Sequence, residues 1–383
     1  MQIAIVHDYL NQCGGAERVV CELAELYREA PIYTSIYNPD LTWPELKAAS
    51  IHTSWLQNLP FSHKYFKLLL PFYPSVFGGL KLSGYDVILS SSSSFAKGVQ
   101  TDEGTIHICY CHSPTRFLWF YDDYVRKERY AETLNRLPFP LVGLIVYLLR
   151  NWDLVACHRP DYYIANSVAV QGRIRKIYHR DSCVIHPPVD VERFQVNPLD
   201  EGYYLVVSRL NAYKRIDLAV QAFNELSLPL VVVGDGPQRR VLEKMAQSNI
   251  HFKGHLSDQE VTRYFEGCRA FIFPGEEDFG ITPLEANACG KPVIAYASGG
   301  ALDSVREGLN GVFFRAQTVP ALKEAVRSST EMDWDPKAIR AHAEGFSPKI
   351  FQQKIAQFVH QVVMDAKTAE EHTPPQSAFE TTS

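Results

Sequence analysis

The run from residue 270 to residue 295 constrains the fold more than any other part of the chain, because it combines a strand, a loop, a helix start and a second strand. Its first residues, Ala270–Phe273, are apolar and aromatic and have the length of a buried strand. Thr282 and Pro283 match the start of a helix, with a hydroxyl at the N-cap and proline at the first helical position. Pro292–Ala295 is apolar again. This order predicts a parallel α/β sheet in which a helix begins at the carboxyl end of a strand.

The loop before that helix contains glycines and acidic residues, and backbone N–H groups at a helix start bind anions. Glu277 and Glu285 lie on either side of the turn. An anion site flanked by carboxylates that can bind hydroxyl groups suits a phosphorylated sugar. Two alternatives stay open: Glu285 would also close a capping box with Thr282, and a loop glutamate such as Glu277 is usually solvated.

Length and composition limit the class of protein. A chain of 383 residues, 46% hydrophobic and 21% charged, is long enough for two globular domains. The net charge of −5 argues against a general nucleic-acid-binding protein. The eight cysteines lack the spacing of zinc ligands, and no apolar run reaches the roughly 18 residues of a membrane-spanning helix. Because Met1 leads directly into a strand, we expect no signal peptide and a cytoplasmic location, with peripheral contact to the inner face of the membrane as an option.

The chain begins with the same kind of unit. Gln2–Leu10 is an apolar run with strand character, and Glu17–Glu29 has the spacing of an amphipathic helix. Gly14 and Gly15 lie in the turn between them, in a pattern that matches neither the dinucleotide-binding sequence nor the P-loop. The spacing alone favours a tight turn that needs glycine for a positive φ.

Two stretches of the first half are candidates for contact with a membrane surface. Leu56–Leu82 is aromatic, basic and amphipathic, and Arg136–Arg150 encloses the longest apolar run of the chain. The alternatives are a core helix whose lysines reach outward for the first stretch and a buried helix for the second.

Polar residues follow two further apolar runs of the first half. Asp86–Ser94 ends in a run of serines, which forms either a linker or the floor of a site. Thr105–Cys111 leads to His112, which therefore stands at the carboxyl end of a strand, where ligands of α/β sheets bind. A lone histidine is more often structural. Val170–Arg180 predicts a basic helix, which is either a solvated face or a contact for a phosphate group.

The second half repeats the alternation of strand and helix. Tyr203–Ser208 is apolar, and Arg209 and Lys214 flank the turn that follows it and opens a helix. Two cations at such a turn can neutralise a diphosphate, with a solvated pair of cations as the alternative.

Two runs of the sequence resemble a known family. Glu277 to Ile294 (EDFGITPLEANACGKPVI) resembles the glutamate-pair signature of retaining glycosyltransferases of family 4, although Asp278 stands where glycine is common and Asn287 where methionine is. The run YCHSPTRFLW, residues 110–119, resembles the motif of family members that build bacterial surface polysaccharides.

The resemblance implies an α/β fold with two facing Rossmann-like domains, the GT-B type, and a cleft between them. We expect an acceptor-side domain at 1–190 and a nucleotide-sugar-binding domain at 200–345. A helix at 347–365 would cross back to the first domain, and the polar tail at 366–383 would be disordered.

The resemblance also assigns roles to matching positions. Arg209 and Lys214 would grip the donor diphosphate, Glu277 would hold sugar hydroxyls, Glu285 would take the ribose, and His112 would face the sugar. The residues with an expected catalytic role are His112, Arg209, Lys214 and Glu277. The residues expected to bind the donor are Gly14, Gly15, Gly234, His255, Leu256, Asp278, Phe279, Gly280, Ile281, Thr282 and Glu285. No metal and no cofactor is expected.

The activity implied by the resemblance is a retaining, metal-independent transfer of a hexose, with mannose favoured and glucose next. The donor would be a GDP- or UDP-linked sugar, and the acceptor a glycan or lipid-linked molecule in polysaccharide or glycolipid synthesis. The alternatives are a nucleotide-sugar 2-epimerase, a non-catalytic subunit that binds the donor, and a general membrane-binding protein. No nucleic-acid partner is expected.

Overall fold

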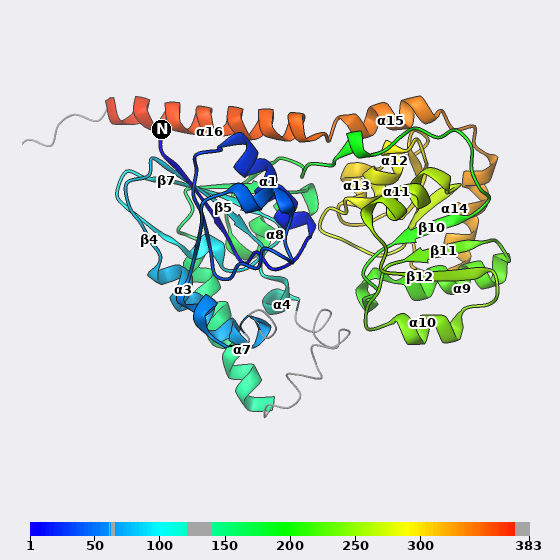
Figure 1. Cartoon of the computed structure of the whole chain (residues 1–383), viewed down its shortest axis with the longest axis horizontal. Helices are drawn as coiled ribbons and strands as arrows, with labels where there is room; N and C mark the ends of the chain where they lie inside the picture. The colour runs from blue at the N-terminus through cyan, green and yellow to red at the C-terminus, as the bar shows by residue number, and fades with distance from the viewer. Residues whose placement is uncertain (61, 63–65, 121–138, 372–383) are drawn as a thin grey trace, which may run out of the picture.

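The computed structural model describes residues 1–60, 62, 66–120 and 139–371. The chain forms two α/β domains that lie side by side, and a long C-terminal helix returns from the second domain along the first (Figure 1). This arrangement confirms the predicted class of two Rossmann-like domains.

The first domain contains a seven-stranded parallel sheet in the order β3-β2-β1-β5-β7-β8-β9. Its central strands are buried along almost their whole length, as expected of parallel strands covered on both faces. The strands are β1 (Ile3–His7), β2 (Ile32–Thr34), β3 (Ile51–Thr53), β5 (Val87–Ser92), β7 (Ile106–Cys111), β8 (Tyr162–Ala165) and β9 (Cys183–Val184). A separate two-stranded sheet pairs β4 (Lys81–Leu82) with β6 (Gln100–Thr101).

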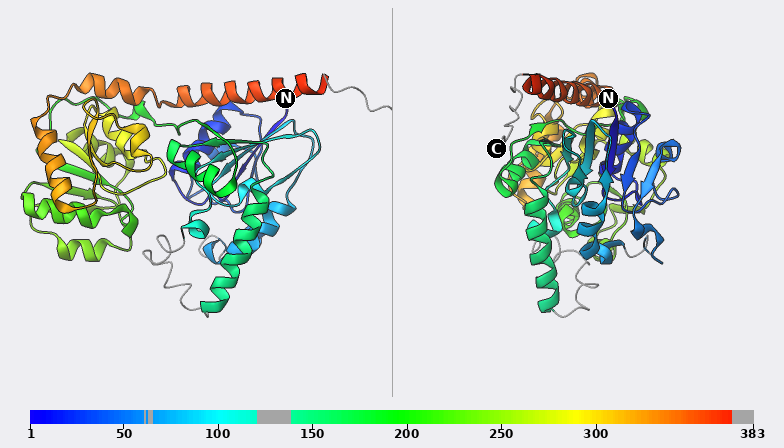
Figure 2. Two further views of the ribbon diagram at one scale, coloured as in Figure 1. Left: turned by 180° about the vertical axis from the view of Figure 1, so that it is seen from behind. Right: turned by 90° about the vertical axis from the view of Figure 1, so that its left-hand side faces the viewer.

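Helices pack around this sheet, and α7 projects from the body on the side away from α16 (Figure 2). The α-helices of this domain are α1 (Gly15–Leu26), α3 (Tyr73–Gly79), α4 (Arg116–Trp119), α7 (Phe139–Ala156) and α8 (Val168–Tyr178). Shorter 3₁₀ helices are η1 (Pro44–Ala48), η2 (Trp55–Asn58), η3 (Phe66–Phe72), η4 (Ala96–Gly98) and η5 (Val191–Arg193).

The second domain contains a six-stranded parallel sheet in the order β12-β11-β10-β13-β14-β15. The strands are β10 (Tyr204–Val207), β11 (Leu230–Val233), β12 (Ile250–Gly254), β13 (Ala270–Phe273), β14 (Val293–Tyr296) and β15 (Gly311–Phe314). The helices are η6 (Ala212–Lys214), α9 (Ile216–Leu226), α10 (Arg239–Met245), α11 (Asp258–Gly267), α12 (Thr282–Ala288), α13 (Ala301–Ser304), α14 (Val319–Glu331) and α15 (Pro336–Glu344).

Both sheets have a switch point, where the strand order reverses, next to their first strand. In the first sheet β1 lies between β2 and β5, and in the second sheet β10 lies between β11 and β13. Loops that leave the carboxyl ends of two such strands diverge and leave a crevice, which is where open α/β sheets bind ligands. The fold therefore places the glycine loop after β1, the basic turn after β10 and the acidic loop after β13 at the two switch points.

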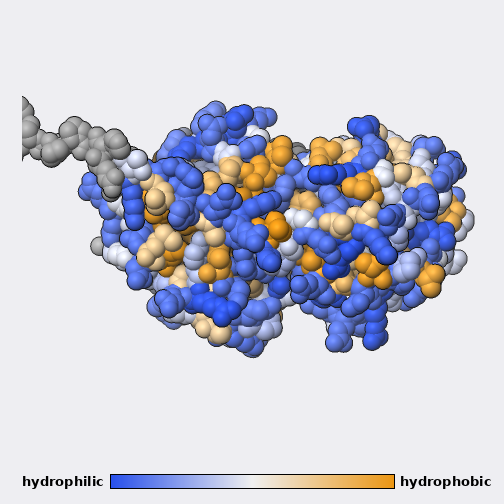
Figure 3. Space-filling model, turned by 90° about the horizontal axis from the view of Figure 1, so that it is seen from above, coloured by the Kyte–Doolittle hydropathy of each residue, from blue (hydrophilic) through white to orange (hydrophobic). Residues whose placement is uncertain are grey.

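Helix α16 (Pro348–Glu371) completes the core of the first domain. Phe351, Ile355 and Val359 repeat at intervals of four residues and are buried with the apolar residues of α1 and the first sheet. Seen from the side of this helix, the molecule has two lobes with a mainly hydrophilic surface (Figure 3). The helix continues to residue 371, so the prediction of disorder was wrong for residues 366–371; residues 372–383 lie outside the described part.

Two local predictions need correction. Helix α12 begins at Thr282 and its N-cap is Ile281, so Thr282 is not the capping residue and no side-chain capping hydrogen bond forms. The alternative interpretation of Leu56–Leu82 as a core helix is also wrong: in its described part, 3₁₀ segments precede α3, and Pro71 lies inside one of them. Residues 61, 63–65 and 136–138 of the two proposed membrane stretches lie outside the described residues.

Candidate functional site

The glycine loop of the first domain closes against the second domain. A Cβ on Gly14 would lie 3.7 Å from Nη2 of Arg209, and a Cβ on Gly15 would lie 2.9 Å from Cδ1 of Ile281. Gly14 has a φ of −129°, and neither glycine has a positive φ. The favoured explanation, a tight turn that needs a positive φ, was therefore wrong: a Cβ on Gly15 would be too close to Ile281 of the second domain, and a Cβ on Gly14 would be too close to Glu17 of its own domain.

The basic turn after β10 and the acidic loop after β13 touch one another. Lys214 Nζ forms an ion pair with Glu277, and a Cβ on Gly275 would lie only 2.8 Å from Cα of Lys214. Arg209, at the start of the turn, is exposed and makes no ion pair with any residue that the structure describes. The turn therefore carries one cation that is already paired with a carboxylate, Lys214, and one cation, Arg209, that faces the glycine loop.

The acidic residues beside Glu277 reach the first domain. The Asp278 carboxylate accepts hydrogen bonds from Arg173 and, at 3.3 Å, from Arg116. Arg173 also donates to Glu276 at 2.9 Å, and Ser167 donates to the backbone oxygen of Asp278. The carboxylate of Asp278, which the resemblance assigned to donor binding, thus contributes to the contact between the domains.

Glu285 lies one turn into α12. It does not close a capping box, so the structural alternative for this residue was wrong. Its carboxylate is 3.7 Å from the Arg193 guanidinium. Burial raises the pKa of Glu285, and the positive charge of Arg193 opposes that rise. A largely buried carboxylate held by one weak ion pair is free to bind hydroxyl groups of a ligand.

His112 lies at the carboxyl end of β7, buried to all but 8% of its surface. Its Nε2 is 2.8 Å from Oγ of Ser91 on the neighbouring strand. Burial lowers the pKa of His112 to about 3, and the nearby His7 acts in the same direction, so the ring is neutral at neutral pH.

The serine run is not a linker, because its Ser91 lies on β5 and contacts His112. The carboxylate of Asp8 accepts four backbone hydrogen bonds from the residues that follow, at 93–96.

Three of the predicted donor-binding residues lie after the outer strands of the second sheet. Gly234 has a φ of 122°, and a Cβ there would overlap the backbone oxygen of Ser208, so only glycine fits. His255 is exposed after β12, and Leu256 is half-buried against the core. They follow β11 and β12, which lie on the side of β10 opposite β13 in the strand order of the second sheet.

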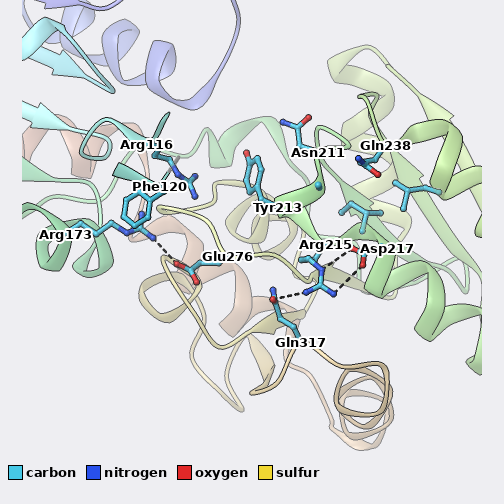
Figure 4. A pocket seen from close by; sticks show the side chains of 13 residues that line it. Arg116, Phe120, Arg173, Asn211, Tyr213, Arg215, Asp217, Gln238, Glu276 and Gln317 are labelled. Atoms are coloured by element: carbon cyan, nitrogen blue, oxygen red, sulfur yellow. Dashed lines mark hydrogen bonds and ion pairs between the residues drawn. The ribbon is translucent and has the colours of Figure 1, made fainter. Parts of the chain in front are cut away.

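A cavity of about 650 Å³ opens between the domains beside the acidic loop (Figure 4). Arg116, Phe120 and Arg173 face it from the first domain, and Tyr213 and Arg215 face it from the second. Arg116 stacks over the Tyr213 ring at 5.3 Å, and Arg173 stacks over the Phe120 ring at 5.2 Å. The remaining lining residues are Asn211, Ala212, Ile216, Asp217, Gln238, Leu242, Glu276 and Gln317.

Several residues of this site were missed from the sequence. Arg116 lies inside the run YCHSPTRFLW but received no role, and Arg173 was one of several cations of a helix whose charged face could simply be solvated. Arg193 and Tyr213 carried no signal at all. A motif shows which segment matters, but it does not show which side chain crosses to the other domain.

Two features are absent from the described residues. No group of three or more His, Cys, Asp or Glu side chains there has the arrangement of a metal site. No helix in the described part of the chain has the length and apolar character needed to cross a bilayer.

Two family models match adjacent parts of the chain. The model described as Glycosyltransferase Family 4 matches residues 13–193, and the model described as Glycosyl transferases group 1 matches residues 189–345. Together they cover both domains, and with them the glycine loop, the basic turn and the acidic loop of the site.

Among curated relatives, the chain is 27% identical over 221 residues to an uncharacterized glycosyltransferase of Methanocaldococcus jannaschii, a match of 56% of this chain and 60% of the relative. It is 33% identical over 123 residues to the GDP-mannose-dependent alpha-mannosyltransferase of Corynebacterium glutamicum, covering 31% and 30%. It is 26% identical over 293 residues to the alpha-1,3/1,6-mannosyltransferase ALG2 of Homo sapiens, covering 67% and 68%. The first two matches span less than two thirds of those relatives.

Among solved structures, the chain is similar to Anabaena HepE in complex with UDP, with a TM-score of 0.70 and 18% identity over 94% of this chain and 100% of that one. It is also similar to the sucrose-phosphate synthase of Thermosynechococcus elongatus, with a TM-score of 0.72 and 18% identity over 95% and 100%. At these identities the similarity shows the fold alone.

Proposed function

The chain belongs to family 4 of the glycosyltransferases, in the group with two Rossmann-like domains, and we propose that it transfers a hexose from a nucleotide-diphosphate sugar to a glycan or lipid-linked acceptor, with retention of configuration and without a metal ion. GDP-mannose is the favoured donor, because relatives from Corynebacterium glutamicum and Mycolicibacterium smegmatis are named as GDP-mannose-dependent mannosyltransferases. A glucose donor is the next choice. The acceptor would be an intermediate of polysaccharide or glycolipid synthesis.

One observation carries this proposal. Lys214 pairs with Glu277 at the switch point of the second sheet, and Arg209, at the start of the same turn, lies opposite the glycine loop of the first domain. A diphosphate needs cations and a sugar needs acceptors for its hydroxyl groups, and this point supplies both. On donor binding the phosphate would take Lys214 and the sugar would take Glu277, so each partner of the ion pair exchanges one polar contact for another.

The mechanism follows from these positions. As the bond between the anomeric carbon and the phosphate oxygen breaks, negative charge grows on the leaving phosphate, and Arg209 and Lys214 stabilise that charge. The acceptor hydroxyl attacks the anomeric carbon on the face from which the phosphate leaves, and a phosphate oxygen takes the hydroxyl proton. Glu277 and His112 hold the sugar from the two domains, and neither has to act as a covalent nucleophile.

We place the acceptor in the cavity next to the acidic loop. Its lining of arginines, amides and carboxylates with two aromatic rings suits a sugar, which binds through hydroxyl groups and apolar ring faces. The positive charges are matched by neighbouring acids: Arg173 pairs with Glu276, and Arg215 pairs with Asp217. A neutral glycan therefore fits the cavity better than a polyanion does.

The test of the proposal is turnover of GDP- and UDP-sugars by the purified protein, with oligosaccharides and lipid-linked sugars offered as acceptors. Arg209→Ala combined with Lys214→Ala should lower kcat/KM by about 10³-fold or more, because two charged donors to the leaving phosphate are lost. Lys323→Ala is the matched control, since it removes a cation of the same domain that pairs with Glu225 on the surface. Equal turnover of the double variant and the control would reject the phosphate assignment.

Two further measurements separate the finer parts of the proposal. Proton NMR of the product should show the same anomeric configuration as the donor, and an inverted product would reject retention. Activity should survive chelation by EDTA, and a requirement for added Mg²⁺ or Mn²⁺ would reject metal independence.

The rival functions predict different results in the same assays. A 2-epimerase would convert the donor sugar to its epimer with no acceptor present. A non-catalytic subunit would bind a nucleotide sugar in a thermal-shift screen and turn over no donor with any acceptor.

Contact with a membrane rests on α7. Leu144, Tyr147, Leu148 and Val155 lie along this helix and are 53–65% exposed. Apolar residues at intervals of three and four share one helix face, and such a face binds at a lipid surface. Leu148→Glu should reduce flotation with vesicles of phosphatidylethanolamine and phosphatidylglycerol. Leu302→Glu, a residue exposed to a similar degree in the second domain, should not; equal flotation of both variants would reject the assignment.

A further inference from the structure

Behind His112 lies a chain of polar side chains that links the glycine loop to the sugar side of the cleft. Ser91 Oγ is 2.8 Å from His112 Nε2 and 3.2 Å from His7 Nδ1. His7 Nε2 in turn is 3.7 Å from Oε1 of Glu17, in the first turn of α1. All four residues are buried. The strands place them together, because His7 of β1 and Ser91 of β5 are register partners at the carboxyl ends of their strands.

The donor and the acceptor of each hydrogen bond among these side chains follow from which ring and oxygen atoms carry a proton. His7 Nδ1 is 2.9 Å from the backbone oxygen of Ser91, and a carbonyl oxygen can only accept. The proton of His7 therefore sits on Nδ1. At the other end of the ring, Nε2 faces a carboxylate, which also accepts when ionised.

The direction in which the pKa of His7 is shifted agrees with this assignment of protons. Burial lowers the pKa of His7, but the adjacent carboxylate of Glu17 and the negative charge of Asp8 outweigh burial and raise the pKa above its ordinary value. Gln12 donates to Oε1 of Glu17 at 2.8 Å and holds the carboxylate in place. In the neutral and in the protonated ring alike, Nδ1 of His7 carries the proton that it donates to the Ser91 carbonyl, so Nδ1 cannot accept a hydrogen bond. Ser91 therefore cannot donate to His7, and its hydroxyl proton is available for His112.

We propose that Glu17, His7 and Ser91 are positioning residues that hold His112 in one tautomer, with its proton on Nδ1, so that His112 presents an N–H donor to an oxygen of the bound sugar. Ser91 Oγ–H donates to Nε2 of His112, and a neutral ring with an accepting Nε2 carries its proton on Nδ1. Nδ1 of His112 makes no hydrogen bond to any described residue, so it is the ring atom left for a ligand. That the ligand is a sugar rests on the proposed function.

The same series of polar side chains connects the glycine loop with His112, which explains why the loop and His112 act on one substrate. The second oxygen of Glu17, Oε2, is buried without a hydrogen-bond partner among the described residues. A Cβ on Gly14 would lie 2.5 Å from this oxygen, and Arg209 reaches the same point from the other domain. The carboxylate that keeps His7 protonated thus lies directly beneath the loop that faces the diphosphate cations.

The first experiment reads the tautomer of His112 directly, in the full-length protein labelled with nitrogen-15 at histidine. Comparison with His112→Gln assigns the His112 signals, and two-bond nitrogen–proton correlations distinguish a protonated Nδ1 from a protonated Nε2. The proton is expected on Nδ1 in the native chain, and Ser91→Ala should shift part of the population to Nε2. A proton on Nε2 in the native chain would overturn the proposal. This measurement needs no substrate, so it stands even if no donor is turned over.

The second experiment measures turnover of the variants. Ser91→Ala should lower kcat about tenfold, the worth of roughly one hydrogen bond, and Ser91→Thr, which keeps the hydroxyl, should recover most of that loss. Ser90→Ala is the matched control. Ser90 precedes Ser91 on β5, and its Oγ likewise lies 2.8 Å from a ring nitrogen of a buried histidine, His107. Thermal denaturation of the alanine variants separates loss of stability from loss of activity. Equal kcat values for Ser91→Ala and Ser90→Ala would overturn the proposal.

Discussion

The contact of Asp278 with Arg116 and Arg173 should hold the two domains together, and Asp278→Asn tests it. The carboxylate accepts hydrogen bonds from both guanidinium groups of the first domain. These side chains are 16–25% exposed, so solvent screens them only in part. The substitution keeps the shape of the residue and removes its charge.

The magnitude follows from the kind of contact. A hydrogen bond to a charged group contributes roughly 1.5–3 kcal/mol when buried. Partial exposure reduces that value, and Arg173 keeps Glu276 as a second partner. We therefore expect Asp278→Asn to cost the closed arrangement about 1–2 kcal/mol, a factor of about 5–30 in the equilibrium between closed and open domains.

Small-angle X-ray scattering measures that equilibrium, because separated domains increase the radius of gyration. Asp278→Asn should give a larger radius than the native chain and should need more nucleotide sugar to return to the native value. Arg175→Gln is the control, since Arg175 lies on the same helix as Arg173 and pairs with Asp181 within one domain. If both variants scatter like the native chain, the contact does not hold the domains together.

Three further predictions concern other parts of the molecule. A Cβ in Gly300→Ala would overlap the backbone of Phe279, so the acidic loop should shift and donor affinity measured by calorimetry should fall at least tenfold. Phe351→Ala should lower the free energy of unfolding of the first domain by about 3–5 kcal/mol in urea denaturation, because this buried ring joins α16 to the core. Burial lowers the pKa of His107 and His112 to about 3, so below pH 6.5 the unfolded chain binds protons that the folded chain does not. The free energy of unfolding should then decrease by about 1.4 kcal/mol for each such histidine per unit by which the pH is lowered below 6.5, and His107→Leu should reduce the slope by the contribution of one histidine.

The sequence predicted strands better than helix starts. The bounds of β13 agree with the predicted ones, and β7 begins one residue after the predicted start, because short apolar runs between polar residues leave little choice of register. The start of α12 was wrong by one residue, since proline is accepted at either of the first two helical positions and Ile281 provides no side chain to mark the cap. Local patterns fix where an element lies in the chain, and neighbouring elements decide its ends.

Prediction of the site from the sequence is limited by contacts between residues that lie far apart in the sequence. Ser91 and His112 belong to different strands, and only the parallel register of β5 and β7 brings them within hydrogen-bond distance. Arg116 and Arg173 meet Asp278 only after the two domains have packed. No spacing in a single sequence encodes these approaches, so the segments of the site were predicted and most of its polar contacts were not.

The acidic loop shows how one short segment acquires two different roles. Glu276, Glu277 and Asp278 are equivalent by composition, and each would be expected to be solvated. Packing gives them different contacts. The loop backbone lies directly against Gly299 and Gly300, at the start of α13, where a Cβ on either glycine would overlap it. In this conformation Glu277 reaches Lys214 of its own domain while its neighbours reach Arg173 of the other. The residue that we propose to bind the sugar is therefore adjacent to the residues that contact the other domain, so we expect closure of the domains and formation of the donor site to be coupled.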